Sequence, residues 1–356
     1  MATSKKDQTT GPVPKPEAPP LFFRDILGQE RVLTQLRTAM GRGRLAHAYL
    51  FLGPDGVGKA ATARALSAAL NCARPREDGD ACGDCPSCRR LAAGTHPDFL
   101  IITPEPQKSQ IAIDRIRELR RLTEYPPLGD GWRVVLIKPA EALTVISDAA
   151  ANALLKTLEE PPPRHLLVLT AQGEADLLPT IVSRCHKLVF TPLPLDLIAR
   201  ELERRRGLNA SAAALLANLS GGSLGRALVL DPEDLLSRRR QLLADLAQIR
   251  QGSATAVLDW AQRLARDRSE LHNFLLLAQL WYRDLLLAHF HAPAALLANQ
   301  DLGGELEQAR AAGTPALWFA GCAALGAAQR QLQANLNPEL TLDILGLKLA
   351  APRVSI

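Results

Sequence analysis

The feature that most constrains the fold is a glycine-rich turn, GPDGVGK over residues 53–59, which matches the pattern G-x-x-x-x-G-K. The apolar run His47–Leu52 precedes it and predicts a buried strand, while the Ala- and Leu-rich segment Ala60–Leu70 predicts a helix. In this context the loop N–H groups and the helix N-terminus cradle phosphates, and the lysine reaches them. We therefore expect a phosphate-loop domain whose nucleotide contacts include Gly53, Gly56, Gly58 and Lys59.

Further apolar runs predict the rest of a parallel sheet, because helical patterns lie between most of them. These runs are Phe99–Ile102, Arg133–Ile137, His165–Thr170 and Lys187–Phe190. After residue 194 only helical patterns follow, and one of them predicts a single helix over residues 294–311. The expected organisation is a disordered tail at 1–20, an α/β domain at 21–192, a small helical lid at 193–233 and an all-α C-terminal domain at 234–356.

Composition narrows the class of protein. Hydrophobic residues make up 47% of the chain and charged residues 22%, which is typical of a globular protein and excludes a mainly disordered or collagen-like one. No apolar run reaches the ~18 residues of a membrane span. The N-terminal segment lacks the apolar stretch of a secretory signal, so the cytoplasm is the expected location. The formal charge of +5 permits nucleic-acid contact without establishing it.

Two substitutions indicate that the loop does not support ATP hydrolysis. The motif requires Ser or Thr after its lysine to bind Mg²⁺, and Ala60 stands there. The strand Arg133–Ile137 runs into Lys138, where a Mg²⁺-binding Asp is expected, and Glu141 is displaced along the chain. Without the cation, charge on the γ-phosphoryl group is poorly neutralised. Binding of ATP or ADP without turnover remains compatible with the sequence.

Four of the six cysteines cluster with the spacing C-x₉-C-x₂-C-x₂-C. They are Cys72, Cys82, Cys85 and Cys88, and four thiolates close the shell of a structural Zn²⁺ site. An iron–sulfur cluster and free thiols are the alternatives. Zinc is favoured because the segment is a Gly- and Pro-rich insertion with no redox partner in view. His96 is a candidate substitute ligand, although a surface histidine is the preferred interpretation.

Several strings together resemble one family: the clamp-loader subunits of bacterial DNA polymerase III, of the AAA+ class, and within it the delta-prime group. The resemblance covers residues 22–230 and, more weakly, the helical remainder. Besides the loop and the cysteine insertion, the strings are FRDILGQ at Phe23–Gln29, NALLKTLEEPP at Asn152–Pro162 and LLPTIVSRC at Leu177–Cys185.

The resemblance implies a hetero-pentamer with the gamma/tau motor and delta subunits, which opens the sliding β clamp and places it around primed DNA, with no membrane involved. Arg184 of the SRC string matches an arginine that acts in trans on ATP held by a neighbouring subunit. Arg226 matches the position from which the lid senses nucleotide, and Thr170 lies near the polar sensor that ends the fourth strand. The C-terminal helices resemble the collar that holds the pentamer together.

The missing magnesium ligands separate the chain from the gamma/tau motor and point to a ring member that is not an ATPase by itself. Two other functions stay open. One is an active ATPase in which Glu141 or Asp148 replaces the missing carboxylate. The other is a zinc-containing DNA-binding protein on a dead NTPase scaffold. This last function has less support, because aromatic residues make up only 4% of the chain and none interleaves with basic residues in the cysteine segment.

Overall fold

The computed structural model describes residues 21–105, 108, 110–143, 149–251, 253–334 and 336–350. The tail expected at 1–20 and Asp148 therefore lie outside the described residues. The chain divides into two compact units, Met1–Pro192 and Leu193–Ile356.

Five parallel strands form the sheet of the first unit. In spatial order they are β2 (Phe99–Ile102), β3 (Arg133–Ile137), β4 (His165–Ala171), β1 (Ala48–Leu52) and β5 (His186–Val189). All five expected strands are confirmed, with ends that move by a residue at β1, β4 and β5. Because the strands are parallel, the residues that follow β1, β3 and β4 meet at one edge of the sheet.

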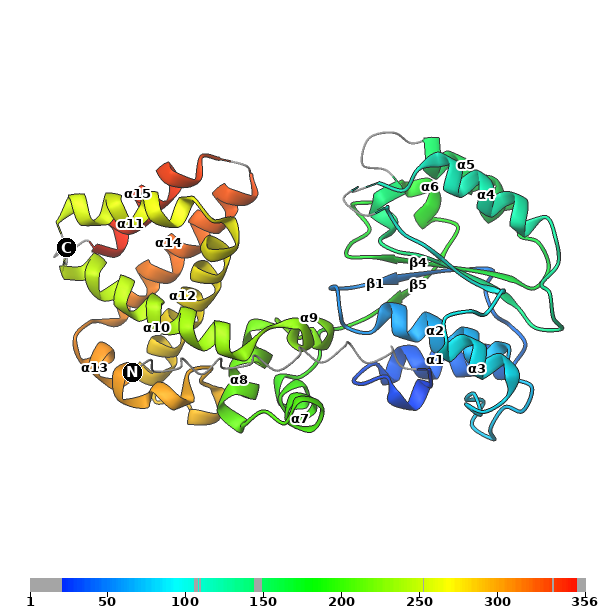
Figure 1. The fold of residues 1–356 in the computed structure, drawn as a ribbon, viewed down its shortest axis with the longest axis horizontal. Helices are drawn as coiled ribbons and strands as arrows, with labels where there is room; N and C mark the ends of the chain where they lie inside the picture. The colour runs from blue at the N-terminus through cyan, green and yellow to red at the C-terminus, as the bar shows by residue number, and fades with distance from the viewer. Residues whose placement is uncertain are drawn as a thin grey trace, which may run out of the picture. The chain divides into compact units, whose positions relative to one another are not determined.

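Helices cover both faces of this sheet (Figure 1). One face packs against α1 (Glu30–Gly41) and α2 (Lys59–Leu70), and the other against α4 (Ile113–Thr123), α5 (Ala149–Glu159) and α6 (Pro179–Val182). Every residue of β1, β3 and β4 is buried. Two-sided burial explains why these strands are near-continuous apolar runs without alternation.

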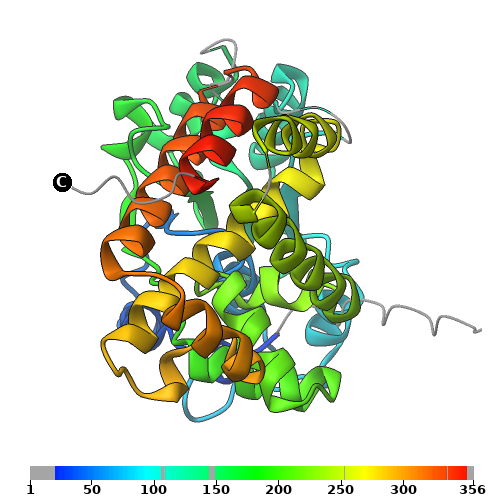
Figure 2. The ribbon, with the colours of Figure 1, turned by 90° about the vertical axis from the view of Figure 1, so that its left-hand side faces the viewer.

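The second unit is helical throughout its described residues and has one core, which includes Trp260 and Trp318. Figure 2 faces this unit, with α14 in orange beside α15 in red. Its division into a lid and a C-terminal domain remains a prediction. The helices are α7 (Leu195–Arg206), α8 (Ala210–Leu219), α9 (Leu224–Val229), α10 (Pro232–Gln251), α11 (Ala254–Ala265), α12 (Arg268–His289), α13 (Gly303–Ala311), α14 (Pro315–Gln333) and α15 (Pro338–Ala350).

The single helix expected over 294–311 is wrong. Two short 3-10 turns, η3 (Ala294–Leu296) and η4 (Gln300–Leu302), precede α13 instead. The cause is Asp284 of α12, which is fully buried and accepts hydrogen bonds from the backbone N–H groups of Ala298 and Asn299, at 2.9 and 2.8 Å. A buried carboxylate needs such donors. Because these two backbone N–H groups donate to Asp284, they are not available for the hydrogen bonds of a continuous helix.

Within the described ranges, no single helix is long and apolar enough to cross a membrane. Two helices bent by 112° against each other, Gln300–Ala311 and Pro315–Leu332, are together long and apolar enough by length and composition alone.

Candidate functional site

The turn between β1 and α2 has a backbone that only glycine adopts readily. Gly53 has φ 141° and Gly58 has φ 111°, both in the left-handed region. A Cβ on Gly53 would collide with the carbonyl oxygen of Phe190, just after β5. Gly58 directly precedes the first residue of α2, so the helix N-terminus opens into the loop. The structure thus brings the three motif glycines and Lys59 together at one edge of the sheet.

Lys59 is buried, and its ammonium group contacts the loop that carries it. Nζ donates to the carbonyl oxygen of Gly53 and to that of Pro54, at 2.9 Å, and lies 3.5 Å from Asp55 Oδ1. Burial lowers the pKa of Lys59, while the negative charges of Asp55 and Glu141 oppose that shift. A phosphate that bound this ammonium would therefore have to displace acceptors of the loop itself.

A residue outside the sequence motifs, Gln172, connects two carboxylates at the loop. It directly follows β4, and its side-chain Nε2 donates to Asp55 Oδ2 at 2.8 Å. Its backbone N–H donates to Glu141 Oε1 at 2.5 Å. Glu141 belongs to η2 (Ala140–Leu143), which follows β3. The position of Gln172 after a predicted strand was the one sequence signal for its placement at this edge.

The atoms that would hold magnesium in an active loop are replaced. Ala60 offers no oxygen at its position in α2, and Lys138 follows β3. Thr62 cannot substitute where it stands, because its hydroxyl donates to the carbonyl oxygen of Gly58 at 2.9 Å, inside the helix. The loop thus offers backbone N–H groups and an ammonium for phosphate, without a hydroxyl beside the lysine.

Thr170 and Arg226 are the two other residues that the sequence places at the nucleotide site. Thr170 is buried in β4, where it pairs in register with Phe51 of β1. Arg226 lies in the second unit, exposed in α9, with its backbone N–H donating to Ser223 Oγ at 3.1 Å. The nucleotide-sensing roles of both residues remain predictions.

Arg184 lies in the turn after α6, and its side chain is 34% exposed. Its Nη2 donates to Glu159 Oε1 at 2.7 Å, and its Nη1 donates to the carbonyl oxygen of Thr180 at 2.9 Å. The neighbouring Cys185 is buried, which raises the pKa of its thiol to about 12 and keeps it neutral. In this turn the guanidinium of Arg184 is charged and partly exposed, while the thiol beside it is buried and neutral.

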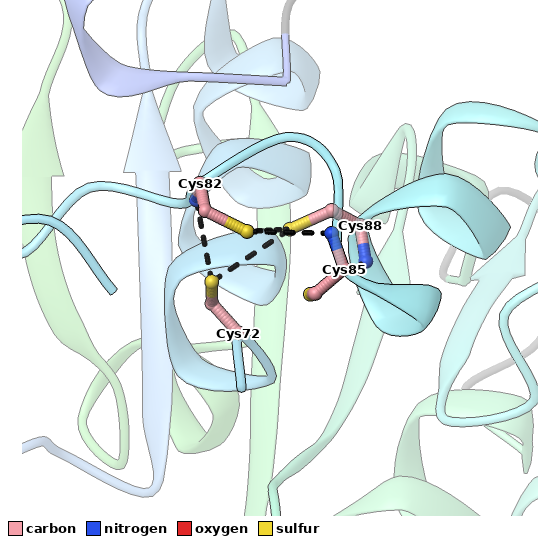
Figure 3. A group of neighbouring side chains, drawn as sticks. All are labelled: Cys72, Cys82, Cys85 and Cys88. Carbon is pink, nitrogen blue, oxygen red and sulfur yellow. Dashed lines mark hydrogen bonds between the residues drawn. The ribbon is translucent and has the colours of Figure 1, made fainter. Parts of the chain in front are cut away.

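The four clustered cysteines converge on one point (Figure 3). All four Sγ atoms lie within 4.8 Å of one another, and Cys88 Sγ lies 3.8 Å from Cys72 Sγ and 4.0 Å from Cys82 Sγ. An ion with four sulfurs at ~2.3 Å in a tetrahedron separates them by ~3.8 Å. The thiol set therefore fits a closed tetrahedral metal centre. Cys88 lies in α3 (Pro86–Ala92), and Cys85 directly precedes that helix. The sequence patterns did not predict α3.

The insertion is attached to the rest of the first unit by polar contacts. Asp80 is fully buried and accepts hydrogen bonds from the backbone N–H groups of Phe23 and Arg24, at 3.1 and 3.2 Å. His96 is not a member of the thiol group. Its Nε2 lies 3.0 Å from Ser87 Oγ, and its Nδ1 accepts from the backbone N–H of Asp98 at 3.2 Å. Both ring nitrogens thus serve the protein scaffold.

The sheet order, the loop and the helices on both faces define a P-loop NTPase module of the AAA+ type, in which the usual magnesium ligands are replaced. The family model described as "DNA polymerase III, delta subunit" matches residues 28–194. DNA polymerase III subunit delta' of Escherichia coli is 36% identical over 269 residues, which cover 74% of this chain and 75% of the relative. The chain therefore belongs to the delta' family of DNA polymerase III subunits.

Other relatives share less of their length. The subunit delta' of Pseudomonas aeruginosa is 41% identical over 214 residues, which cover 59% of this chain and 63% of the relative. DNA polymerase III subunit tau of Escherichia coli is 37% identical over 227 residues, 61% of this chain and 34% of that subunit. Among solved structures, the Thermotoga maritima RuvB Holliday junction branch migration motor aligns with 17% identity and a TM-score of 0.42 over 79% of this chain and 88% of that one.

Proposed function

We propose that the chain is a ring member of the DNA polymerase III clamp loader that does not hydrolyse ATP and supplies Arg184 to a neighbouring subunit. The observation that carries the proposal is a contrast within the first unit. Ala60 after the loop lysine and Lys138 after β3 stand where magnesium ligands belong, while Arg184 lies partly exposed in the turn after α6. Such a chain is poorly equipped to cleave ATP itself and well equipped to act on ATP held elsewhere.

The chemistry of the guanidinium suits that role. It is planar and always charged, and it offers five N–H donors to the oxygens of a γ-phosphate. In phosphoryl transfer an arginine supplied in trans neutralises charge that develops in the transition state. The partners in this proposal are the gamma/tau motor and delta subunits, joined through the collar of the second unit, together with the sliding β clamp and primed DNA. The place of action is the bacterial cytoplasm.

We further propose that Cys72, Cys82, Cys85 and Cys88 hold a structural Zn²⁺ ion. Four thiolates complete its coordination shell, so no position remains for a reactive water. The chemistry that zinc supplies here is cross-linking of the insertion. The distances between the sulfur atoms support this assignment.

The trans role is tested with Arg184→Ala in a complex reconstituted with the motor and delta subunits, β clamp and primed DNA. We expect DNA-stimulated ATP turnover to fall several-fold while the complex still assembles, because the lost guanidinium acts on the transition state. Arg200→Ala is the matched control, since Arg200 is an exposed arginine of α7 paired with Asp196 at 2.7 Å. An unchanged turnover with Arg184→Ala would remove the trans role from the proposal.

A second candidate function is supported by one observation. Glu141 accepts a hydrogen bond from the backbone N–H of Gln172, whose side chain donates to Asp55 of the loop, so a carboxylate stands beside the loop. If it organised magnesium there, the isolated chain would hydrolyse ATP, and Glu141→Gln would abolish that activity. If the wild-type chain and Glu141→Gln both hydrolyse ATP only at the background rate, the non-hydrolysing function is the one that remains.

A further inference from the structure

We propose that Glu159 is the positioning residue for Arg184, holding its guanidinium in the orientation in which it meets the partner's nucleotide. This inference rests on the trans role proposed above and assigns a function to a residue outside the SRC turn. Its basis is the hydrogen-bonded ion pair between Glu159 Oε1 and Arg184 Nη2, at 2.7 Å, which joins α5 to the turn after α6.

The backbone fixes Glu159 before any partner is present. It is the last residue of α5, and Pro161 to Pro163 follow directly after Glu160. Proline cannot continue a helix, and it also restricts the residue before it. The helix therefore ends at this point, and its terminal carboxylate lies where the Arg184 side chain can reach it.

Two anchors then define the plane of the guanidinium. Glu159 accepts from Nη2, and the carbonyl oxygen of Thr180 accepts from Nη1 at 2.9 Å. Ser183 Oγ is a longer third contact, 3.5 Å from Nη1. Arginine has five N–H donors, so these contacts leave at least two for phosphate oxygens. The group can thus be held from one side and still bind a nucleotide.

The same pair contributes little to the stability of the fold. Arg184 is partly exposed, at 34%, and Glu159 is exposed, at 50%, and ion pairs that solvent reaches are weak. A substitution at Glu159 should therefore act on orientation and not on folding. Orientation matters for rate because a displaced catalytic group loses much of its effect even when it is present.

The test is a double-mutant cycle in the complex reconstituted with motor and delta subunits, β clamp and primed DNA. Its members are Glu159→Ala, Arg184→Ala and the double variant, with Glu159→Gln as the conservative variant and Glu160→Gln as control for charge. We expect Glu159→Ala to lower kcat roughly three- to tenfold without changing KM for ATP. Glu159→Gln should recover part of the rate, because its amide oxygen can still accept the hydrogen bond. Glu160→Gln should match the wild type.

The decisive comparison is additivity. If Glu159 acts through Arg184, the double variant is no slower than Arg184→Ala alone. A wild-type rate or a faster rate in Glu159→Ala overturns the inference, the faster rate meaning that the carboxylate sequesters the guanidinium. Additive losses in the double variant overturn it too. If Arg184→Ala itself leaves the rate unchanged, the trans role fails first and the inference falls with it.

Thermal unfolding of the isolated chain separates positioning from folding. The midpoint for Glu159→Ala should stay within about 2 °C of the wild type, as for the loss of an exposed ion pair. A much lower midpoint would mean that the pair supports the fold, and would overturn the positioning role.

Discussion

At the scale of single residues, the lysine of the phosphate loop is held by acceptors of the loop itself. Lys59 is satisfied by the carbonyl oxygens of Gly53 and Pro54, and Asp55 brings a carboxylate to the same ammonium. Gln172 holds the other oxygen of Asp55 at 2.8 Å. A nucleotide must therefore compete with neutral acceptors and also approach a fixed negative charge.

This arrangement makes a prediction for nucleotide affinity. Asp55→Asn should strengthen binding of ATP and ADP to the isolated chain roughly two- to fivefold, because one exposed negative charge near the phosphates is removed. Titration calorimetry or a fluorescent nucleotide measures the change. Lys59→Ala is the control, since it removes the ammonium that any loop-dependent binding requires. Equal or weaker binding by Asp55→Asn would show that Asp55 does not oppose nucleotide.

At the scale of elements, the sheet could be predicted because buried parallel strands are continuous apolar runs, as in Arg133–Ile137. The position of the phosphate loop followed from the same pattern. The break at Asn299 could not be predicted, because it depends on a hydrogen bond to the buried carboxylate of Asp284, on the preceding helix α12. The hydrogen bonds of Gln172 to Asp55 and of Glu159 to Arg184 could not be predicted either. Each of these hydrogen bonds joins two segments that only the tertiary fold brings together, and no local sequence pattern indicates it.

The cysteine insertion allows a prediction for a whole element. Cys85→Ser should reduce bound zinc from ~1 ion per chain to ~0 and loosen the segment from Cys72 to Cys88, since closed thiolate sites contribute folding energy. Metal analysis and limited proteolysis measure the two effects. Cys322→Ser is the matched control, because Cys322 is a half-buried free cysteine of the second unit. Zinc retained by Cys85→Ser, or iron in the wild type, would contradict the assignment.

At the scale of the whole molecule, the last helix is apolar on two sides. Leu342, Leu345 and Leu349 of α15 are buried in the core of the second unit. Leu340, Ile344 and Leu347 follow helical spacing on another face and are 60%, 39% and 48% exposed. Apolar side chains gathered on an exposed face are typical of an interaction surface. We therefore expect a neighbouring subunit of the proposed assembly to cover this face.

The corresponding prediction concerns assembly. Replacing Leu340, Ile344 and Leu347 together with Ser should leave the isolated chain folded but weaken its association with the motor and delta subunits at least about tenfold, because each apolar side chain buried at an interface contributes on the order of 1 kcal/mol. Size-exclusion chromatography with light scattering measures the bound fraction, and circular dichroism checks the fold. Val229→Ser is the control, since Val229 of α9 is 77% exposed and lies outside the stripe. Undiminished co-elution of the triple variant would mean that the ring is held by surfaces other than this face of α15.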